Sequence, residues 1–284
     1  MKKIINKLSF IGLLFTTLTN AQSDASLLWK IEGNGLEQPS YIYGTIHMIC
    51  QDDYIMTPII QISLESVEAY YAEIDFSNPT ELLQLQAAIV AEEPLSERFD
   101  QETYQELTKL LKSMDIEIDE VENLSNTALI STIGTKTFPC KDLKAYELEF
   151  LQMAIASGKQ TGGLETVSQQ LELLNKSITP ENLIEMLQEV SINGTDETQK
   201  LVKHYKEHNI DIFVELMKEN SYMDAEIYDE LLVQRNHRWM ELIPEIMDRH
   251  STFFAVGAGH LGGESGILQL LKDRGFEVNA VNIH

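Results

Sequence analysis

Short apolar and aromatic runs that end in glycine, with a histidine three residues later, occur near both ends of the chain. The first run covers residues 41–44 and leads to His47, and the second covers residues 253–257 and leads to His260. Such runs are typical of β-strands, and a glycine at the end lets the chain turn sharply. Sites on mixed α/β scaffolds usually lie at strand ends. We therefore expect two strands that direct their imidazoles into one cleft.

The rest of the pattern alternates between strand and helix. Apolar runs at residues 26–32 and 40–44, joined by turn residues at 33–35, predict a β-hairpin. Proline in a first helical position predicts helix starts at Pro58 and Pro180. The other expected strands are residues 71–76, 159–164, 252–256 and 276–282.

Helical periodicity dominates the middle of the chain. We expect a turn at residues 193–196, a helix break near Asn209 and an interruption of the next helix at Pro244. The expected helices are residues 58–70, 102–113, 121–137, 143–157, 197–218, 224–248 and 264–274, with further starts at 79, 165 and 179. Together these elements predict an α/β (α+β) fold, with a mixed central sheet, flanking helices and a helical insertion at about residues 79–250.

The first 21 residues have the pattern of a removable signal peptide. Three lysines precede a short apolar run at residues 8–18, and the small residue Ala21 suits signal peptidase. The run is too short to span a bilayer comfortably, and no other stretch approaches a membrane span. We expect an exported protein, periplasmic or secreted, with a single domain at residues 22–284. No stable membrane insertion is expected after signal cleavage.

The charge balance narrows the class of partner. Among 284 residues the formal net charge is −24. An acidic surface repels the phosphates of nucleic acids and anionic membranes, and it favours solubility or cation binding. A nucleic-acid function is therefore disfavoured, and a peptide or small-molecule substrate is expected.

Two cysteines, Cys50 and Cys140, both lie in the part of the chain expected to be exported. In an oxidising compartment a disulfide is the default state of such a pair. The bridge would tie the first histidine turn to the middle of the chain, because Cys50 lies three residues beyond His47. A catalytic thiol is the weaker alternative, since a lone exported thiol would oxidise.

His47 and His260 are the first candidates for chemistry. A neutral imidazole is a good ligand for a transition metal and a good general base near neutral pH. The alternative is two unrelated turn histidines, because 213 residues of sequence separate them. Their matching glycine context favours a shared function.

Carboxylates follow as the second group of candidates. Glu73 and Asp75 lie on one face of an expected strand, where they could complete a metal shell or act as general base. A solvated strand edge is the alternative in so acidic a chain. Glu165 begins an expected helix directly after a strand, and its alternative role is to complement the helix dipole.

Arg235 and Asn236 form the third group, in the middle of an expected helix. Arg235 could clamp a carboxylate, either of a substrate or of Glu73. A solvated surface arginine is an equally simple interpretation, because most charged helical residues face water.

Two formal motif matches are rejected. Residues 257–262 fit the G-x-G-x-x-G dinucleotide pattern, but the chain ends too soon after them for a Rossmann half and lacks the ribose-binding acid. Residues 204–208 fit the inverted zinc-protease pattern H-x-x-E-H, but their expected helix is short and polar and ends at once.

Taken together, the motifs resemble the TraB/GumN (Tiki-like) family. The resemblance spans nearly the whole mature chain in the family's order, and only the complete set of short motifs is specific. It is carried by residues 28–31, 44–47, 73–75, 163–166 with Gln169, 235–236 and 256–261.

The resemblance implies a fold like that of erythromycin esterase and the haem-binding ChaN-like proteins. It also implies the activity of the Tiki members, which are described as divalent-metal-dependent proteases built on two Gly-x-x-His turns and a glutamate. By position, His47 and His260 would be the histidines. Glu73 resembles the family's glutamate by position, and Glu165 is the alternative candidate for that role.

These observations predict an exported metal-dependent hydrolase that acts on peptides. His47 and His260 would hold Mn, Co or Zn together with Glu73 or Asp75, and a carboxylate would take a proton from the bound water. Arg235 or Asn236 would stabilise the developing oxyanion. The alternatives are a non-catalytic protein that binds haem or another ligand, and a peptide-sequestering inhibitor on the same fold.

Overall fold

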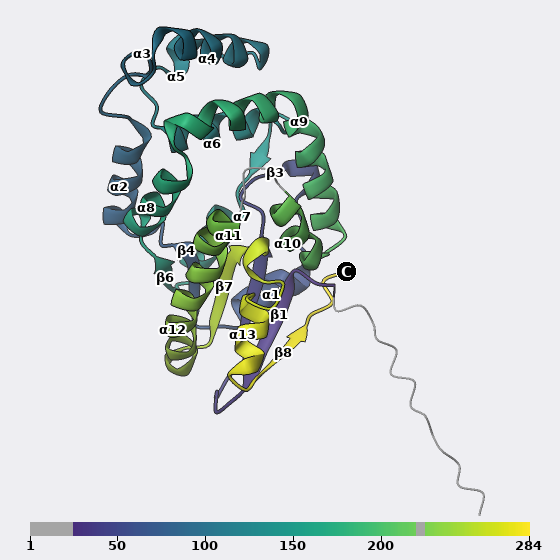
Figure 1. Cartoon of the computed structure of the whole chain (residues 1–284). Coiled ribbons are helices and arrows are strands. Elements are labelled where there is room, and N and C mark those ends of the chain that lie inside the picture. The colour runs from purple at the N-terminus through teal and green to yellow at the C-terminus, as the bar shows by residue number, and fades with distance from the viewer. Residues whose placement is uncertain (1–24, 220–224) are drawn as a thin grey trace, which may run out of the picture.

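The computed structural model describes residues 25–219 and 225–284 (Figure 1). The expected signal peptide, residues 1–21, lies outside these residues. Within the described residues, no helix combines the length and the apolar composition that a membrane span requires.

The predicted hairpin is present. Strand β1 (Leu28–Gly33) pairs antiparallel with β2 (Ser40–Thr45), with Leu28 opposite Tyr43. The turn between them contains Gly33, Asn34 and Gly35 with positive φ, a conformation that glycine and asparagine adopt most easily.

A six-stranded mixed sheet forms the centre of the molecule, in the order β6-β4-β7-β2-β1-β8. Strands β6, β4, β7 and β2 are parallel neighbours, whereas β1 and β8 are antiparallel to the strands beside them. The carboxyl ends of four strands therefore meet along one edge. The other strands are β4 (Ala69–Ile74), β6 (Gln160–Glu165), β7 (Thr252–Gly257) and β8 (Phe276–Ala280).

Helices cover the sheet on both faces. Helix α7 (Tyr146–Ala156) packs on β4, β6 and β7, while α12 (Gln234–Arg249) and α13 (Ile267–Asp273) contact β6 and β8 respectively. Figure 1 shows α12 and α13 in front of the sheet and α1 (Pro58–Glu65) behind it. Phe150 of α7 lies 5.2 Å from Tyr43 and 5.0 Å from Phe253, ring centre to ring centre. Such aromatic contacts add to the free energy gained by burial.

The middle of the chain forms a second, helical core away from the sheet. Leu107, Leu111, Leu129 and Ile133 are fully or almost fully buried there. In Figure 1, α3, α4 and α5 lie farthest from the sheet. The helices of this part and its connections are α2 (Pro79–Ile89), α3 (Leu95–Arg98), α4 (Gln101–Ser113), α5 (Ile118–Val121), α6 (Asn126–Lys136), α8 (Val167–Ser177), α9 (Pro180–Lys206), α10 (Ile210–Glu219) and α11 (Ala225–Tyr228).

The turn predicted at residues 193–196 is wrong, because α9 continues through it. Its glycine, Gly194, has a packing reason instead. A Cβ at Gly194 would lie 2.8 Å from Cγ2 of Thr137, so only glycine lets α9 approach the end of α6 so closely. The predicted break near Asn209 is confirmed, since α9 ends at Lys206 and α10 begins at Ile210.

Pro244 does not interrupt α12, contrary to the prediction. A proline removes one backbone hydrogen bond, but the helix keeps a buried face that includes Trp239, Ile243 and Met247. Packing of this face outweighs the local preference.

Several other expected helices have different bounds. The helix expected at residues 58–70 ends at Glu65, because the chain enters β4 at Ala69. The helix expected at residues 121–137 begins at Asn126 instead, with Ser125 as its N-cap, because the short helix α5 ends at Val121. Residues 143–157 begin as the short strand β5 (Leu143–Lys144) before α7.

The predicted disulfide between Cys50 and Cys140 is confirmed. It joins β3 (Ile49–Cys50) to the segment just before β5, and these two strands pair with each other. The bridge thus ties the turn that carries His47 to the start of α7.

Replacing Cys50 and Cys140 with alanine should lower the free energy of unfolding by about 2–4 kcal/mol, because the bridge closes a long loop in the unfolded chain. The sequence separation of the two cysteines is 90 residues. Urea denaturation of the double variant, beside the native chain with and without a reducing agent, measures this loss. Equal midpoints for all three samples would contradict the prediction.

Candidate active site

The carboxyl edge of the four parallel strands gathers the predicted site residues. Glu165 is the last residue of β6, and Glu73 is the second-last residue of β4. His260 ends a short 3-10 turn directly after β7, and His47 follows the end of β2 by two residues. Because β2 and β7 are adjacent, with Thr45 opposite Gly257, the two Gly-x-x-His turns lie at the same edge.

Neighbouring atoms approach the glycines of both turns closely. A Cβ on Gly44 would lie 2.8 Å from Cδ1 of Leu261 and 3.2 Å from Ala258, so the two turns pack directly on each other. Gly257 leaves room for Glu73, whose Oε1 accepts a hydrogen bond from the Gly257 amide at 2.8 Å. The two glycines therefore have different packing reasons, because Gly44 lets the turns approach each other and Gly257 leaves room beside Glu73.

Arg235 is the centre of a buried charge cluster. Its Nη2 donates to Oε2 of Glu73 at 2.6 Å and to Oε1 of Glu165 at 2.6 Å, and its Nε donates to Oε2 of Glu165 at 3.2 Å. The amide of Gln170 donates to both carboxylates. Arg235 thus clamps Glu73, one of the alternatives expected from the sequence. The alternative of a solvated surface arginine is wrong, because Arg235 is buried.

Two local features of the chain place these groups. Arg235 follows a π-helical turn, Asp229–Val233, and its Nη1 donates to the carbonyl of Leu231 in that turn at 3.0 Å. Such turns are frequent at functional sites. Glu165 does not begin a helix, as the sequence suggested, but ends β6, because Thr166 forms the capping box that starts α8.

The cluster keeps Glu73 ionised. Burial alone would raise the pKa of Glu73, but Arg235, then His260 and His47, outweigh burial and lower that pKa to about 2. A buried carboxylate needs this compensation, because an unpaired charge away from water is strongly unfavourable.

Asn236 fixes the proton position on His260. Its Nδ2 donates to the carbonyls of His260 and Ser265, so its Oδ1 must accept the 2.7 Å hydrogen bond from Nδ1 of His260. The lone pair of His260 therefore lies on Nε2, which is 3.1 Å from Nη1 of Arg235. Burial, followed by the charge of Arg235, lowers the pKa of His260 to about 3, so the ring stays neutral near pH 7.

His47 has the opposite environment. Its Nδ1 lies 3.5 Å from Oε1 of Glu147, the second residue of α7, and the Thr45 hydroxyl donates to the same oxygen at 2.7 Å. The interaction with Glu147 raises the pKa of His47 to about 9. Because 74% of the His47 side chain is exposed, water screens the pair, and it orients the ring more than it stabilises the fold.

A cavity of about 460 Å³ is lined both by His47 and by Glu73 of the buried charge cluster. His47, Glu147, Glu73 and Gln170 line part of it. Its other walls are apolar and come from the end of β4, from α2 and from α7. The cavity is therefore the place where a ligand could contact both the exposed histidine and the buried charge cluster.

The residues do not fit a metal ion as they lie. The guanidinium of Arg235 occupies the space between Glu73, Glu165 and His260, where a metal cation would have to bind. It donates hydrogen bonds to all three side chains. Across the described residues, no group of three or more histidine, cysteine or acidic side chains could hold a metal. The donor types themselves, imidazole and carboxylate, are those that Zn, Mn and Co accept.

Asp75 is not brought to this cluster. It follows β4, and its Oδ1 accepts hydrogen bonds from the amide and hydroxyl of Ser77.

The histidines of the rejected H-x-x-E-H pattern have separate partners. His204 pairs with Glu207, and the ring of His208 stacks on that of His284. Neither residue lines the cavity beside His47.

Sequence analysis did not identify Glu147 and Gln170. Glu147 lies in the first turn of α7, where an acid is ordinarily explained by the helix dipole. Gln170 is an unremarkable position in an amphipathic helix, α8. Only the fold brings them to the cavity, and no sequence motif could have indicated it.

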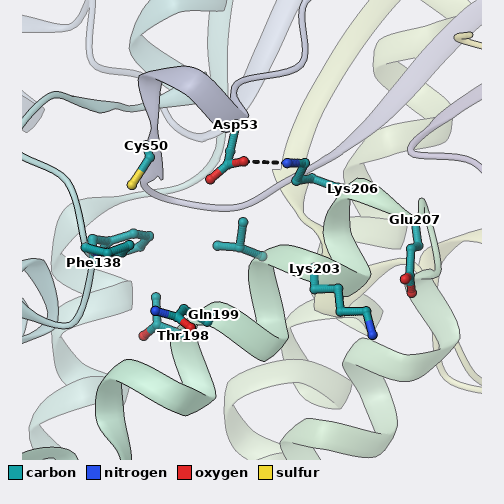
Figure 2. Close-up of a pocket in the computed structure, with 10 residues that line it drawn as sticks. Cys50, Asp53, Phe138, Thr198, Gln199, Lys203, Lys206 and Glu207 are labelled. Atoms are coloured by element: carbon teal, nitrogen blue, oxygen red, sulfur yellow. Dashed lines mark hydrogen bonds and ion pairs between the residues drawn. The ribbon is translucent and has the colours of Figure 1, made fainter.

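Figure 2 shows a second cavity, of about 390 Å³, beside the disulfide. Cys50 and Phe138 lie along it, facing residues of α9 such as Gln199. An ion pair of 2.5 Å between Asp53 and Lys206 spans the gap to α9. Of the predicted site residues that the structure describes, Cys50 alone lines this cavity, so we place the candidate site in the first one.

The neutral His260 predicts a pH effect on stability. In the folded chain His260 binds a proton only near pH 3, whereas an unfolded histidine does so near pH 6.5. Between these values the unfolded chain binds more protons, so the free energy of unfolding falls on acidification, by up to about 1.4 kcal/mol per pH unit. Denaturant titrations from pH 7 to pH 4 should show a shallower fall in His260→Gln than in the native chain.

The control for this prediction is His237→Gln, since His237 is exposed on the same helix as Arg235. It should keep the native pH dependence. Parallel curves for the native chain and His260→Gln would contradict the neutral state of His260.

Comparison with known proteins gives relatives over most of the chain. The sequence is similar to Metalloprotease TIKI2 of Danio rerio, with 22% identity over 313 residues, 89% of this chain and 60% of that protein. It is similar to TIKI1 of Danio rerio, with 23% identity over 317 residues, 90% of this chain and 63% of that protein. It is also similar to TIKI1 of Homo sapiens, with 22% identity over 314 residues, 89% of this chain and 61% of that protein.

The chain spans about three fifths of the length of these relatives. No solved structure shows significant similarity. The TraB/PrgY/gumN family matches residues 27–280, from the start of the hairpin to the end of β8. This range includes both Gly-x-x-His turns and the charge cluster at the sheet edge, and the chain belongs to the TraB/PrgY/gumN family.

Proposed function

We propose that this chain is an exported hydrolase of peptide bonds. The observation that carries the proposal is the shared cavity, whose wall holds His47 with its partner Glu147 on one side and Glu73 of the buried cluster on the other. The similarity to proteins named metalloproteases supports the reaction class. The whole proteins are longer than this chain, so their activity enters here as a proposal only.

The two histidines have the opposite protonation states that hydrolysis uses. His47, with a pKa raised to about 9, is a proton donor at neutral pH, and His260, with a pKa lowered to about 3, is neutral. Environments that separate two pKa values in this way assign acid and base roles.

In our proposal a peptide lies in the cavity with its scissile bond beside His47. Hydrolysis breaks the C–N bond, places the hydroxyl of water on the carbonyl carbon and delivers a proton to the amine. His47 gives that proton, with Glu147 holding its Nδ1 side. His260 is buried and does not line the cavity, so its Nε2 lone pair accepts from water only after Arg235 withdraws from its 3.1 Å contact, a change that also removes a charge that lowers the pKa of His260.

The proposal includes a requirement for a divalent metal, Mn, Co or Zn, which the assay below tests. The relatives are named metalloproteases, which supports a metal. In the arrangement described above, Arg235 would have to leave Glu73 and His260 before an ion could reach them. A requirement for metal would therefore imply a movement of α12 or of the Arg235 side chain.

Export is supported by the lysine-rich apolar N-terminal segment and by the disulfide. A disulfide between Cys50 and Cys140 persists in an oxidising compartment. We propose a periplasmic or secreted location on this basis.

The test is cleavage of an internally quenched peptide library by the purified chain, assayed with chelator and with added Mn, Co or Zn. Mass spectrometry of the products identifies the cleaved bonds. Cleavage by the native chain that is lost in both His47→Ala and His260→Ala is the expected result. Cleavage that persists in both variants would come from a contaminant and would overturn the proposal.

A ligand-binding role is the competing outcome. It would appear as no cleavage under any metal condition together with saturable binding, for instance of haem with a shifted Soret band. A peptide-sequestering role would appear as saturable peptide binding with every peptide bond intact.

A further inference from the structure

Helix α2 has an unusual distribution of polar and apolar side chains. Its only buried residue is Glu81, whose Oε2 accepts a hydrogen bond from the amide of Val167 at 2.7 Å. Two of its leucines are exposed, Leu82 at 39% and Leu83 at 66%, and Leu85 is half-buried. A helix that packs only for stability buries its leucines and exposes its acids. The reversed pattern indicates that this helix presents apolar side chains to a ligand.

The leucines of α2 differ in whether they line the cavity. Leu82 and Leu85 line the cavity that contains His47, whereas Leu83 does not. Opposite them, Leu148 of α7 lines the same cavity and is 46% exposed, while Ile155 of the same helix is 56% exposed and lies outside it. The cavity thus has two apolar walls, from α2 and α7, that are open to solvent without a ligand.

The apolar walls continue directly into the polar part of the site. Leu148 follows Glu147, the partner of His47, and Ile74 follows Glu73. A ligand held by the walls would therefore extend toward both groups. The cavity volume of about 460 Å³ lies within the range of roughly 300–1,000 Å³ that small-ligand sites occupy.

Charge at the polar end restricts the ligand further. Glu73 and Glu147 line the cavity, and Glu165 lies behind Glu73 against Arg235. The carboxylates of Glu73 and Glu147 line the cavity itself, whereas the guanidinium of Arg235 does not. This balance disfavours an acidic side chain in the cavity.

We propose that the cavity between α2 and α7 is a specificity pocket for a neutral apolar side chain of the peptide substrate, adjacent to the bond that is cleaved. Leu82, Leu85 and Leu148 contact that side chain, and Phe76 and Leu151 also line the pocket. This inference rests on the proposed peptide hydrolysis for its reaction, but the pocket itself can be tested without it.

The activity test uses quenched peptides that differ only at one position, with leucine, phenylalanine, asparagine or aspartate there. The native chain should prefer leucine or phenylalanine, with the largest difference in kcat/KM against aspartate. Leu82→Gln and Leu148→Gln should each reduce the preference for the apolar peptides about 10-fold, the effect that a poorer hydrophobic contact has on discrimination.

Matched controls lie on the same helices. Leu83→Gln and Ile155→Gln replace exposed apolar residues outside the cavity, so they should retain the native preference. An equal loss in the controls would overturn the pocket, because it would assign the exposed residues of α2 and α7 to a partner surface or to stability.

A binding test keeps the pocket falsifiable if no peptide is cleaved. N-acetyl-leucinamide should shift the methyl NMR signals of Leu82, Leu85 and Leu148 in the ¹³C-methyl-labelled chain, and N-acetyl-aspartamide should not. Shifts without any cleavage would retain the pocket and reject peptide hydrolysis. Cleavage without preference and without methyl shifts would reject the pocket and retain hydrolysis.

Discussion

Arg235→Met should lower the free energy of unfolding by about 3–5 kcal/mol at pH 7, because it leaves buried carboxylates without their counter-charge. Arg235 makes two 2.6 Å contacts, one with Glu73 and one with Glu165. Methionine has a similar length and no charge, so the loss reports the unpaired carboxylates more than a cavity. Urea denaturation followed by circular dichroism measures the difference.

Arg238→Met is the matched control, since Arg238 is exposed on the same helix. It should change stability by less than about 0.5 kcal/mol, as surface substitutions usually do. Adding Glu73→Gln and Glu165→Gln to Arg235→Met should restore part of the stability, because the triple variant buries no charge at these positions. A triple variant less stable than Arg235→Met would contradict this explanation.

The effect of Arg235→Met should also depend on pH. In the native chain the pKa of Glu73 is lowered to about 2, so its contribution to stability is present above the usual pKa of about 4.5 and is lost as the pH falls toward 2. In the variant, burial without Arg235 favours the protonated acid. The difference between the two proteins should therefore begin to shrink above pH 4.5, where the buried Glu73 of the variant takes up a proton, and should continue to shrink toward pH 2.

His47→Ala should reduce kcat for peptide cleavage by about 10²–10⁴-fold, because it removes the proton donor of the proposed reaction. The fold should remain intact, since His47 is exposed at the cavity. A stopped assay under saturating substrate, with the thermal midpoint measured beside it, separates loss of chemistry from loss of structure.

His204→Ala is the control for His47→Ala. His204 also pairs with a glutamate, Glu207, at 3.1 Å, but on α9 and away from the cavity. It should leave kcat unchanged. An equal loss in both variants, or a native rate in His47→Ala, would remove His47 from the reaction.

Glu147→Gln tests the positioning role of Glu147. Without this carboxylate the pKa of His47, raised to about 9 in the native chain, should fall toward its ordinary value near 6.5. The alkaline limit of activity should move to lower pH by the same amount, and NMR titration of the His47 ring measures the shift directly. An unchanged limit would assign Glu147 a structural role only.

Much of the architecture follows from local sequence signals. The hairpin at β1 and β2 is specified by two apolar runs around a glycine turn, and β7 with its glycine-histidine turn by the same kind of pattern. The errors occurred where packing overrides local preference. Gly194 and Pro244 lie inside helices, because contacts with neighbouring elements outweigh the tendency of each residue to end a helix.

The sequence by itself indicated the six strands of the central sheet, the paired Gly-x-x-His turns and part of the candidate site, because these depend on periodicity and on the conformational range of glycine. Only the tertiary structure decided that Arg235 lies between Glu73 and Glu165, that His47 is paired with Glu147, and that the leucines of α2 line the cavity. These contacts join elements up to 162 residues apart, as Arg235 and Glu73 are. No local pattern encodes them, because they depend on the order in which the strands assemble into the sheet.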